Sequence, residues 1–114
     1  MTYDVVVIGA GVAGLGAAWK LAQAGRNVAV FERDEVGSGA SGAAAGMLAP
    51  AAEVTFQEEP LLQLGLRSLE LYPEFVDELE ETTGRDLDYR TDGTLVVGID
   101  RDDSEALRRL HDFH

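Results

Sequence analysis

Three glycines at fixed spacing are the residues of this 114-residue chain whose types most directly suggest chemistry. Gly9, Gly11 and Gly14 form the pattern Gly-x-Gly-x-x-Gly directly after the apolar run from Val5 to Ile8. In this pattern the first glycine permits a tight turn, the second lets the backbone approach a pyrophosphate, and the third lets helix and strand pack closely. The N–H groups from Gly11 to Ala13 would then face a diphosphate at a positively polarised helix start.

An acidic residue follows at the position where a dinucleotide site needs one. Glu32 comes 18 residues after Gly14, at the end of a second apolar run. A carboxylate there accepts hydrogen bonds from ribose hydroxyls and repels a 2′-phosphate, which favours FAD or NAD over NADP. Arg33 is then expected to flank the adenine. The alternatives are a glycine turn without function and a surface acid at Glu32.

The elements around these residues are predicted from their apolar patterns. Tyr3 to Ile8 reads as a strand covered on both faces, Leu15 to Ala24 as a helix stopped by Gly25, and Asn27 to Glu32 as a second strand. This order has the size of one βαβ unit. It predicts an α/β, Rossmann-like fold with parallel strands.

Residues 36–52 are rich in glycine and alanine. A flexible linker is one interpretation, but the apolar stretch from Met47 to Pro50 is atypical of linkers. We expect instead a close-fitting loop and a short helix against a ligand. Small side chains let the backbone pack against a bulky group such as a flavin, which favours FAD over NAD.

The second part of the chain is predicted to be mostly helical. Pro60 to Thr83 is amphipathic and is expected to form two helices broken at Pro73. Leu95 to Ile99 reads as a third strand that starts a second, mixed sheet. Asp102 to Glu105 should open a final helix with a buried stripe of Leu107, Leu110 and Phe113. We therefore divide the chain into a cofactor-binding region, 1–52, and an incomplete region, 53–114, that leads toward a substrate domain.

Charge and composition exclude several classes of function. Residues 1–52 carry three basic and four acidic side chains, whereas residues 53–114 carry six arginines and seventeen acids. Such an acidic half repels nucleic acid and anionic membranes. There is no cysteine, and both histidines fall in the last four residues, so no metal site is expected. The apolar runs are too short to span a bilayer and no signal peptide is evident, so we expect a cytoplasmic protein without membrane insertion.

Two stretches resemble a known family. Tyr3 to Arg33, followed by Gly37 to Pro50 with its Ser-x-Ala-Ala-Ala-Gly-Met-Leu motif, is similar to the start of the D-amino-acid oxidase family, in particular its glycine oxidases of thiamine biosynthesis. Asp92 to Leu95 also recurs there. Family members are much longer, so the chain resembles a truncated copy. The resemblance implies FAD contacts beside the three loop glycines, at Val12, Ala13, Glu32, Arg33, Ala40, Ser41, Ala45, Gly46 and Met47. Residues 37–50 contain no histidine for a covalent flavin link, so non-covalent FAD is implied.

The resemblance also implies a reaction. Family enzymes oxidise an amine, here glycine or a small D-amino acid, to the imine and then the 2-oxo acid, with ammonia and hydrogen peroxide as further products. Oxygen and the amino acid would be the small-molecule partners, and a homo-oligomer stays open. We assign no catalytic residue, because the substrate-binding residues of the family lie later in the chain, and we expect the 114 residues alone to be inactive. An NAD-dependent dehydrogenase fragment and a non-catalytic dinucleotide-binding module are the alternatives.

Overall fold

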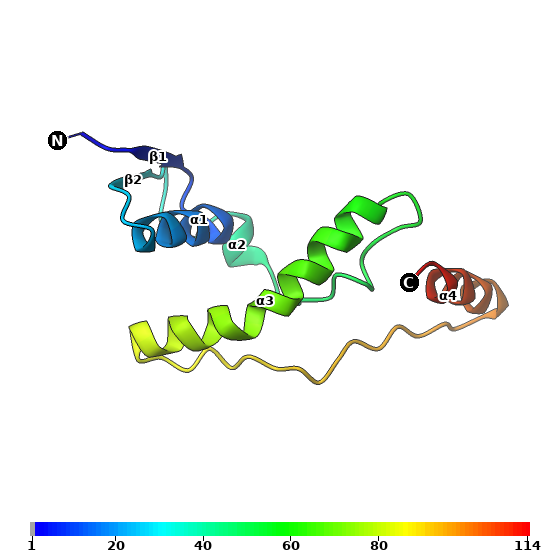
Figure 1. Cartoon of the computed structure of the whole chain (residues 1–114). Helices are drawn as coiled ribbons and strands as arrows, with labels where there is room; N and C mark the ends of the chain where they lie inside the picture. The colour runs from blue at the N-terminus through cyan, green and yellow to red at the C-terminus, as the bar shows by residue number, and fades with distance from the viewer. Residues whose placement is uncertain (1) are drawn as a thin grey trace. The chain divides into compact units, whose positions relative to one another are not determined.

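The chain folds into two compact units, Met1–Met47 and Leu48–His114, in a computed structural model that describes residues 2–114. The first unit contains β1 (Val5–Ile8), α1 (Val12–Gln23), β2 (Val28–Phe31) and the short α2 (Ala40–Ala43). The second contains α3 (Glu59–Thr83) and α4 (Arg101–Phe113) (Figure 1). The predicted functional division at residues 52 and 53 stays a prediction.

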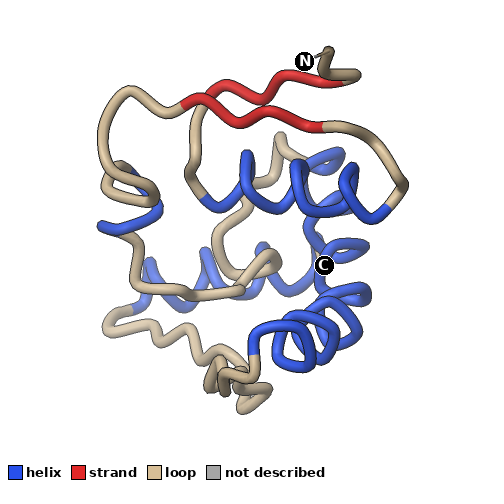
Figure 2. Tube along the Cα trace, turned by 90° about the vertical axis from the view of Figure 1, so that its left-hand side faces the viewer, coloured by secondary structure: helices blue, strands red, loops and turns tan. Residues whose placement is uncertain are grey.

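A parallel strand pair with a helical crossover forms the first unit. Val5 lies opposite Val28 and Ile8 opposite Phe31, and α1 connects the two strands (Figure 2). Apolar β-branched residues favour the two strands, and the glycines between Ile8 and Val12 allow the turn into α1. The predicted βαβ unit and the α/β fold class are confirmed. In the described part of the first unit, the buried apolar side chains are those of Ala10 and Ala18.

One face of this strand pair is uncovered. Val5 and Val7 are half-buried, whereas the alternate residues of β1 are exposed, with Ile8 88% exposed. Successive strand residues point to opposite faces, and α1 covers only one of them. The prediction of a strand covered on both faces is therefore wrong for residues 2–114.

In the second unit, α3 is one helix and not the predicted two. Pro73 lies inside it, and the ribbon changes direction near its middle (Figure 1). Proline removes one backbone N–H and crowds the preceding turn, but the turns on either side keep their hydrogen bonds, so a kink replaces a break. The helix ends at Gly84, whose φ of 65° is the left-handed conformation that glycine adopts easily. Leu62 and Val76 form its buried side.

The third strand predicted at Leu95 to Ile99 is absent. Residues 2–114 contain no strand besides β1 and β2, and Leu95 and Ile99 are 87% and 93% exposed. A strand requires the hydrogen bonds of a neighbour, and the described residues supply none here. The expected start of a mixed sheet is accordingly not formed.

The last helix begins close to its predicted start. The Asp100 side chain caps α4 by accepting a hydrogen bond from the Asp103 N–H at 2.9 Å. The predicted apolar stripe of Leu107, Leu110 and Phe113 is half-buried. None of the helices in residues 2–114 is long and apolar enough to span a membrane.

Candidate dinucleotide site

The glycine loop between β1 and α1 has a shape that needs glycine at two positions. Gly9 has a φ of 101°, which side chains rarely permit, and its N–H donates to the Phe31 carbonyl at 2.8 Å. A Cβ atom at Gly14 would overlap the carbonyl oxygen of Gly9. The turn off β1 and the close packing of α1 against that turn both depend on the absence of side chains.

The first turn of α1 has backbone N–H groups that find no acceptor within the helix. The helix begins at Val12, and its first internal hydrogen bond runs from the Leu15 N–H to the Gly11 carbonyl. The N–H groups of Val12 and Ala13 therefore have no partner within the helix. Gly11 has no side chain with which to cap it. Such a helix start attracts an anion through its N–H groups and its dipole.

The glycine- and alanine-rich segment reaches this helix start. Ser41, in the short helix α2, accepts a hydrogen bond from the Val12 N–H at 2.8 Å through its Oγ. The Gly37 N–H donates to the Ala10 carbonyl at 3.0 Å. A Cβ atom at Gly11 would lie 2.9 Å from the Ser41 Oγ, so the approach of these segments is close.

Glu32 follows β2 directly and is held by the backbone. Its Oε2 accepts the Ala10 N–H at 2.7 Å, and its Oε1 accepts the N–H groups of Arg33 at 2.7 Å and Asp34 at 3.2 Å. The hydrogen bond from Ala10, followed by those from Asp34 and Arg33, lowers the pKa of Glu32 below its usual value. The carboxylate is therefore ionised at neutral pH and acts as an acceptor.

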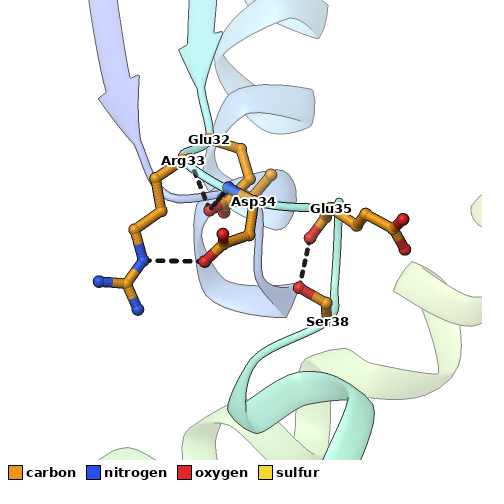
Figure 3. Close-up of polar contacts among 6 residues, drawn as sticks. Glu32, Arg33, Asp34, Glu35 and Ser38 are labelled. Carbon is orange, nitrogen blue, oxygen red and sulfur yellow. Dashed lines mark hydrogen bonds and ion pairs between the residues drawn. The ribbon is translucent and has the colours of Figure 1, made fainter.

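The residues after Glu32 form an exposed turn. Figure 3 shows the Arg33 guanidinium beside Asp34, with Nε donating to Oδ2 at 3.1 Å, and the Ser38 hydroxyl donating to the Glu35 carbonyl at 2.8 Å. Both side chains of the ion pair are exposed, so it contributes little stability. The contact of Arg33 with an adenine stays a prediction.

The structure joins some of the predicted site residues by hydrogen bonds, and others are placed only by their position next to these residues in the chain. The glycine loop, Glu32 and Ser41 meet through the hydrogen bonds above, and Ala40 belongs to the same short helix as Ser41. Ala45, Gly46 and Met47 follow that helix, and the Met47 side chain is exposed. Sequence reasoning missed Ala10, which bonds both Glu32 and Gly37 through its backbone. An alanine side chain gives no signal for such a role.

Comparison with known proteins decides the family. Residues 4–114 match the DAO family, described as FAD dependent oxidoreductase. The chain belongs to this family. It is 38% identical over 111 residues to a glycine oxidase from Geobacillus kaustophilus, covering 97% of this chain and 29% of that protein. It is 42% identical over 108 residues to the bifunctional protein ThiO/ThiG of Trichormus variabilis, covering 95% of this chain and 16% of the relative.

A solved structure of the family has the same fold. Glycine oxidase from Bacillus cereus superposes with a TM-score of 0.85 at 34% identity, covering 98% of this chain and 30% of that one. The resemblance to glycine oxidases predicted from the sequence is confirmed. The chain spans at most about a third of the length of these family members.

The site has the donors and acceptors that the adenosine diphosphate half of FAD requires. The absence of side chains at Gly11 and Gly14 lets Ser41 and the Gly9 carbonyl approach closely, and the first turn of α1 offers N–H groups to an anion. The ionised Glu32 supplies an acceptor for hydroxyl groups. Within residues 2–114, no group of His, Cys, Asp or Glu side chains is arranged to hold a metal ion.

Proposed function

We propose that this chain binds FAD non-covalently and forms the N-terminal cofactor-binding portion of an oxidase of glycine or small D-amino acids. The observation that carries the proposal is the junction of three segments at one helix start. Glu32 bonds to the glycine loop through Ala10, and Ser41 bonds to the same loop through Val12. Family membership makes FAD the dinucleotide that this junction would hold.

Each segment would contact a different part of the cofactor. The diphosphate would lie against the N–H groups at the start of α1, where the macrodipole attracts negative charge. The ribose hydroxyls would donate to Glu32, and Arg33 would flank the adenine. The proposed contacts, from the diphosphate to the flavin, are Gly9, Gly11, Val12, Ala13, Gly14, Glu32, Arg33, Ala40, Ser41, Ala45, Gly46 and Met47.

The proposed oxidation would draw on the cofactor for its chemistry. Bound FAD would supply two-electron oxidation of the amine, with oxygen reduced to hydrogen peroxide. The residues of this chain would bind and orient the cofactor, and none of them is assigned to catalysis. The substrate class is proposed because two of the relatives compared are glycine oxidases, each of which is much longer than this chain.

The NAD-dependent alternative shares the adenosine half of the ligand, so binding must distinguish the two dinucleotides. Titration of the 114-residue chain with FAD, followed by flavin fluorescence, should show saturable binding that ADP reverses. NAD at the same concentration should compete less well than ADP, because its nicotinamide half has no complement here. Tighter binding of NAD than of FAD, or no binding of FAD, would contradict the proposal.

Amine oxidase activity should distinguish the 114-residue chain from the longer oxidase of which it would form a part. The 114 residues should release no peroxide with glycine and FAD. If the reading frame continues past His114, its complete product should oxidise glycine, sarcosine and small D-amino acids faster than bulky ones. Exclusive oxidation of large D-amino acids would place the protein in another branch of the family.

A further inference from the structure

Glu32 makes more hydrogen bonds to its own chain than a ligand acceptor needs. Its two carboxylate oxygens accept three backbone N–H groups, two from the residues directly after it and one from Ala10, 22 positions earlier. At 2.7 Å the bond to Ala10 is short, as charge-assisted hydrogen bonds are. The carboxylate therefore joins the end of β2 to the glycine loop.

Ala10 is the residue through which this link acts on the loop. It is only 2% exposed, so water has little access to its backbone. Its N–H donates to Glu32 and its carbonyl accepts from Gly37. A buried N–H that loses its acceptor carries the full cost of desolvation. Ala10 lies between Gly9 and Gly11, and glycine restricts the backbone less than any other residue. The loop thus depends on external hydrogen bonds for its shape.

We propose that Glu32 is a positioning residue that holds the glycine loop in its anion-binding shape before the cofactor arrives. This role is separate from the ribose contact and rests on the proposed FAD function. The carboxylate fixes Ala10, which directly precedes the N-cap residue Gly11 of α1. The N–H groups at the helix start are thereby oriented in advance, and the loop loses little further conformational freedom on binding.

A ligand without ribose hydroxyls separates the two roles. The probe is an FAD analogue with 2′,3′-dideoxyadenosine, compared with FAD on the parent chain and on Glu32→Ala. If Glu32 contacted only the ribose hydroxyls, Glu32→Ala and the parent chain would bind the analogue with equal affinity. We expect Glu32→Ala to weaken the binding of FAD by about tenfold to a hundredfold, and the binding of the analogue by about fivefold or more.

The matched control is Asp34→Ala. It removes a carboxylate two positions away whose side chain pairs with Arg33 and not with the loop. Both ligands should bind this variant about as they bind the parent chain. A loss as large as that of Glu32→Ala would mean that negative charge alone is responsible, which would overturn the proposal.

A measurement without cofactor tests the same link directly. In the apoprotein, hydrogen exchange of the Ala10 amide should be at least about tenfold faster in Glu32→Ala than in the parent or in Asp34→Ala. Should Glu32→Ala fail to fold, Glu32→Gln serves instead. Its amide oxygen can accept from Ala10, but its NH₂ group would face the N–H groups of Arg33 and Asp34, so smaller losses in both assays are expected.

The outcomes distinguish this inference from the proposed function. Absence of FAD binding in the parent chain would remove the proposed function, whereas the exchange of Ala10 would still report on the loop. Unchanged affinity of Glu32→Ala for the dideoxy analogue, with weakened FAD binding, would leave a ribose contact only and overturn the positioning role. Unchanged exchange at Ala10 would overturn it as well.

Discussion

The two units of the chain differ in how their polar groups are used. In Met1–Met47, side chains join segments far apart in sequence, with Ser41 reaching Val12 across 29 positions. In Leu48–His114, hydrogen bonds such as those of Thr55 with Glu58 and of Asp103 with Asp100 join near neighbours. Long-range bonds shape a loop, whereas local bonds start and end helices. The difference supports the proposal that the dinucleotide would bind to the first unit.

Charge gives the same contrast. The first unit holds four acidic and three basic residues, whereas the second holds seventeen acidic residues and six arginines. An anionic dinucleotide would be repelled by the second unit and tolerated by the first. Substitutions in or against the glycine loop should therefore weaken FAD binding, and substitutions in the second unit should change stability alone.

The largest effect is expected from Gly14→Ala. Its new methyl group would overlap the Gly9 carbonyl oxygen, and a backbone atom yields less easily than a side chain. We expect about 1–3 kcal/mol of destabilisation and a larger loss of FAD affinity than in any of the variants below. The control is Gly16→Ala in the same helix, where a Cβ meets nothing. It should bind FAD normally and gain stability from helix propensity. Equal behaviour of both variants would refute the packing role of Gly14.

Gly11→Val should come next. The Cβ would stand 2.9 Å from the Ser41 Oγ, which can rotate away, so the fold should survive better than in Gly14→Ala. The branched side chain would nevertheless occupy the space where a pyrophosphate approaches the backbone. FAD titration of the folded variant should show a loss greater than that of Glu32→Ala. Affinity equal to the parent would mean that the loop is no phosphate cradle.

Ser41→Ala should have a moderate effect. It removes the acceptor of the Val12 N–H, and loss of such a cap costs about 1 kcal/mol. Denaturant unfolding and FAD titration should both register this change. Ser38→Ala is its control, because the Ser38 hydroxyl bonds within its own turn to Glu35. If both serine variants bind FAD equally well, the Ser41 contact has no part in binding.

The smallest effect on binding is expected from Asp100→Ala. The variant loses the N-cap of α4, which should lower stability by about 1 kcal/mol in denaturant unfolding. FAD affinity should not change, because the second unit contributes no proposed contact. A clear loss of affinity would break the assignment of binding to the first unit alone.

Local patterns made the first unit predictable. The apolar runs predict the two strands and the helix, and the glycines predict a turn that leaves no room for side chains. The position of Glu32 at the end of β2 predicts its role. The partners of those groups were not predictable. Ala10 acts through its backbone, and the link from Ser41 to Val12 depends on how a long loop folds back.

The second unit shows the limits of local patterns more clearly. Pro73 predicted a break, but the turns around it tolerate the missing hydrogen bond within one helix. Leu95 to Ile99 has the composition of a strand and stays unpaired among residues 2–114, because a strand is completed only by a neighbour. Such a pairing is not encoded in the segment itself.

The Ser41 hydroxyl also has a consequence for ligand capture. A hydroxyl has one proton and two lone pairs, and the bond from Val12 uses one lone pair. The proton can donate to an arriving phosphate oxygen while the bond to Val12 persists. No existing hydrogen bond of Ser41 would then need to break before the anion docks on the other N–H groups of the first turn, such as that of Ala13.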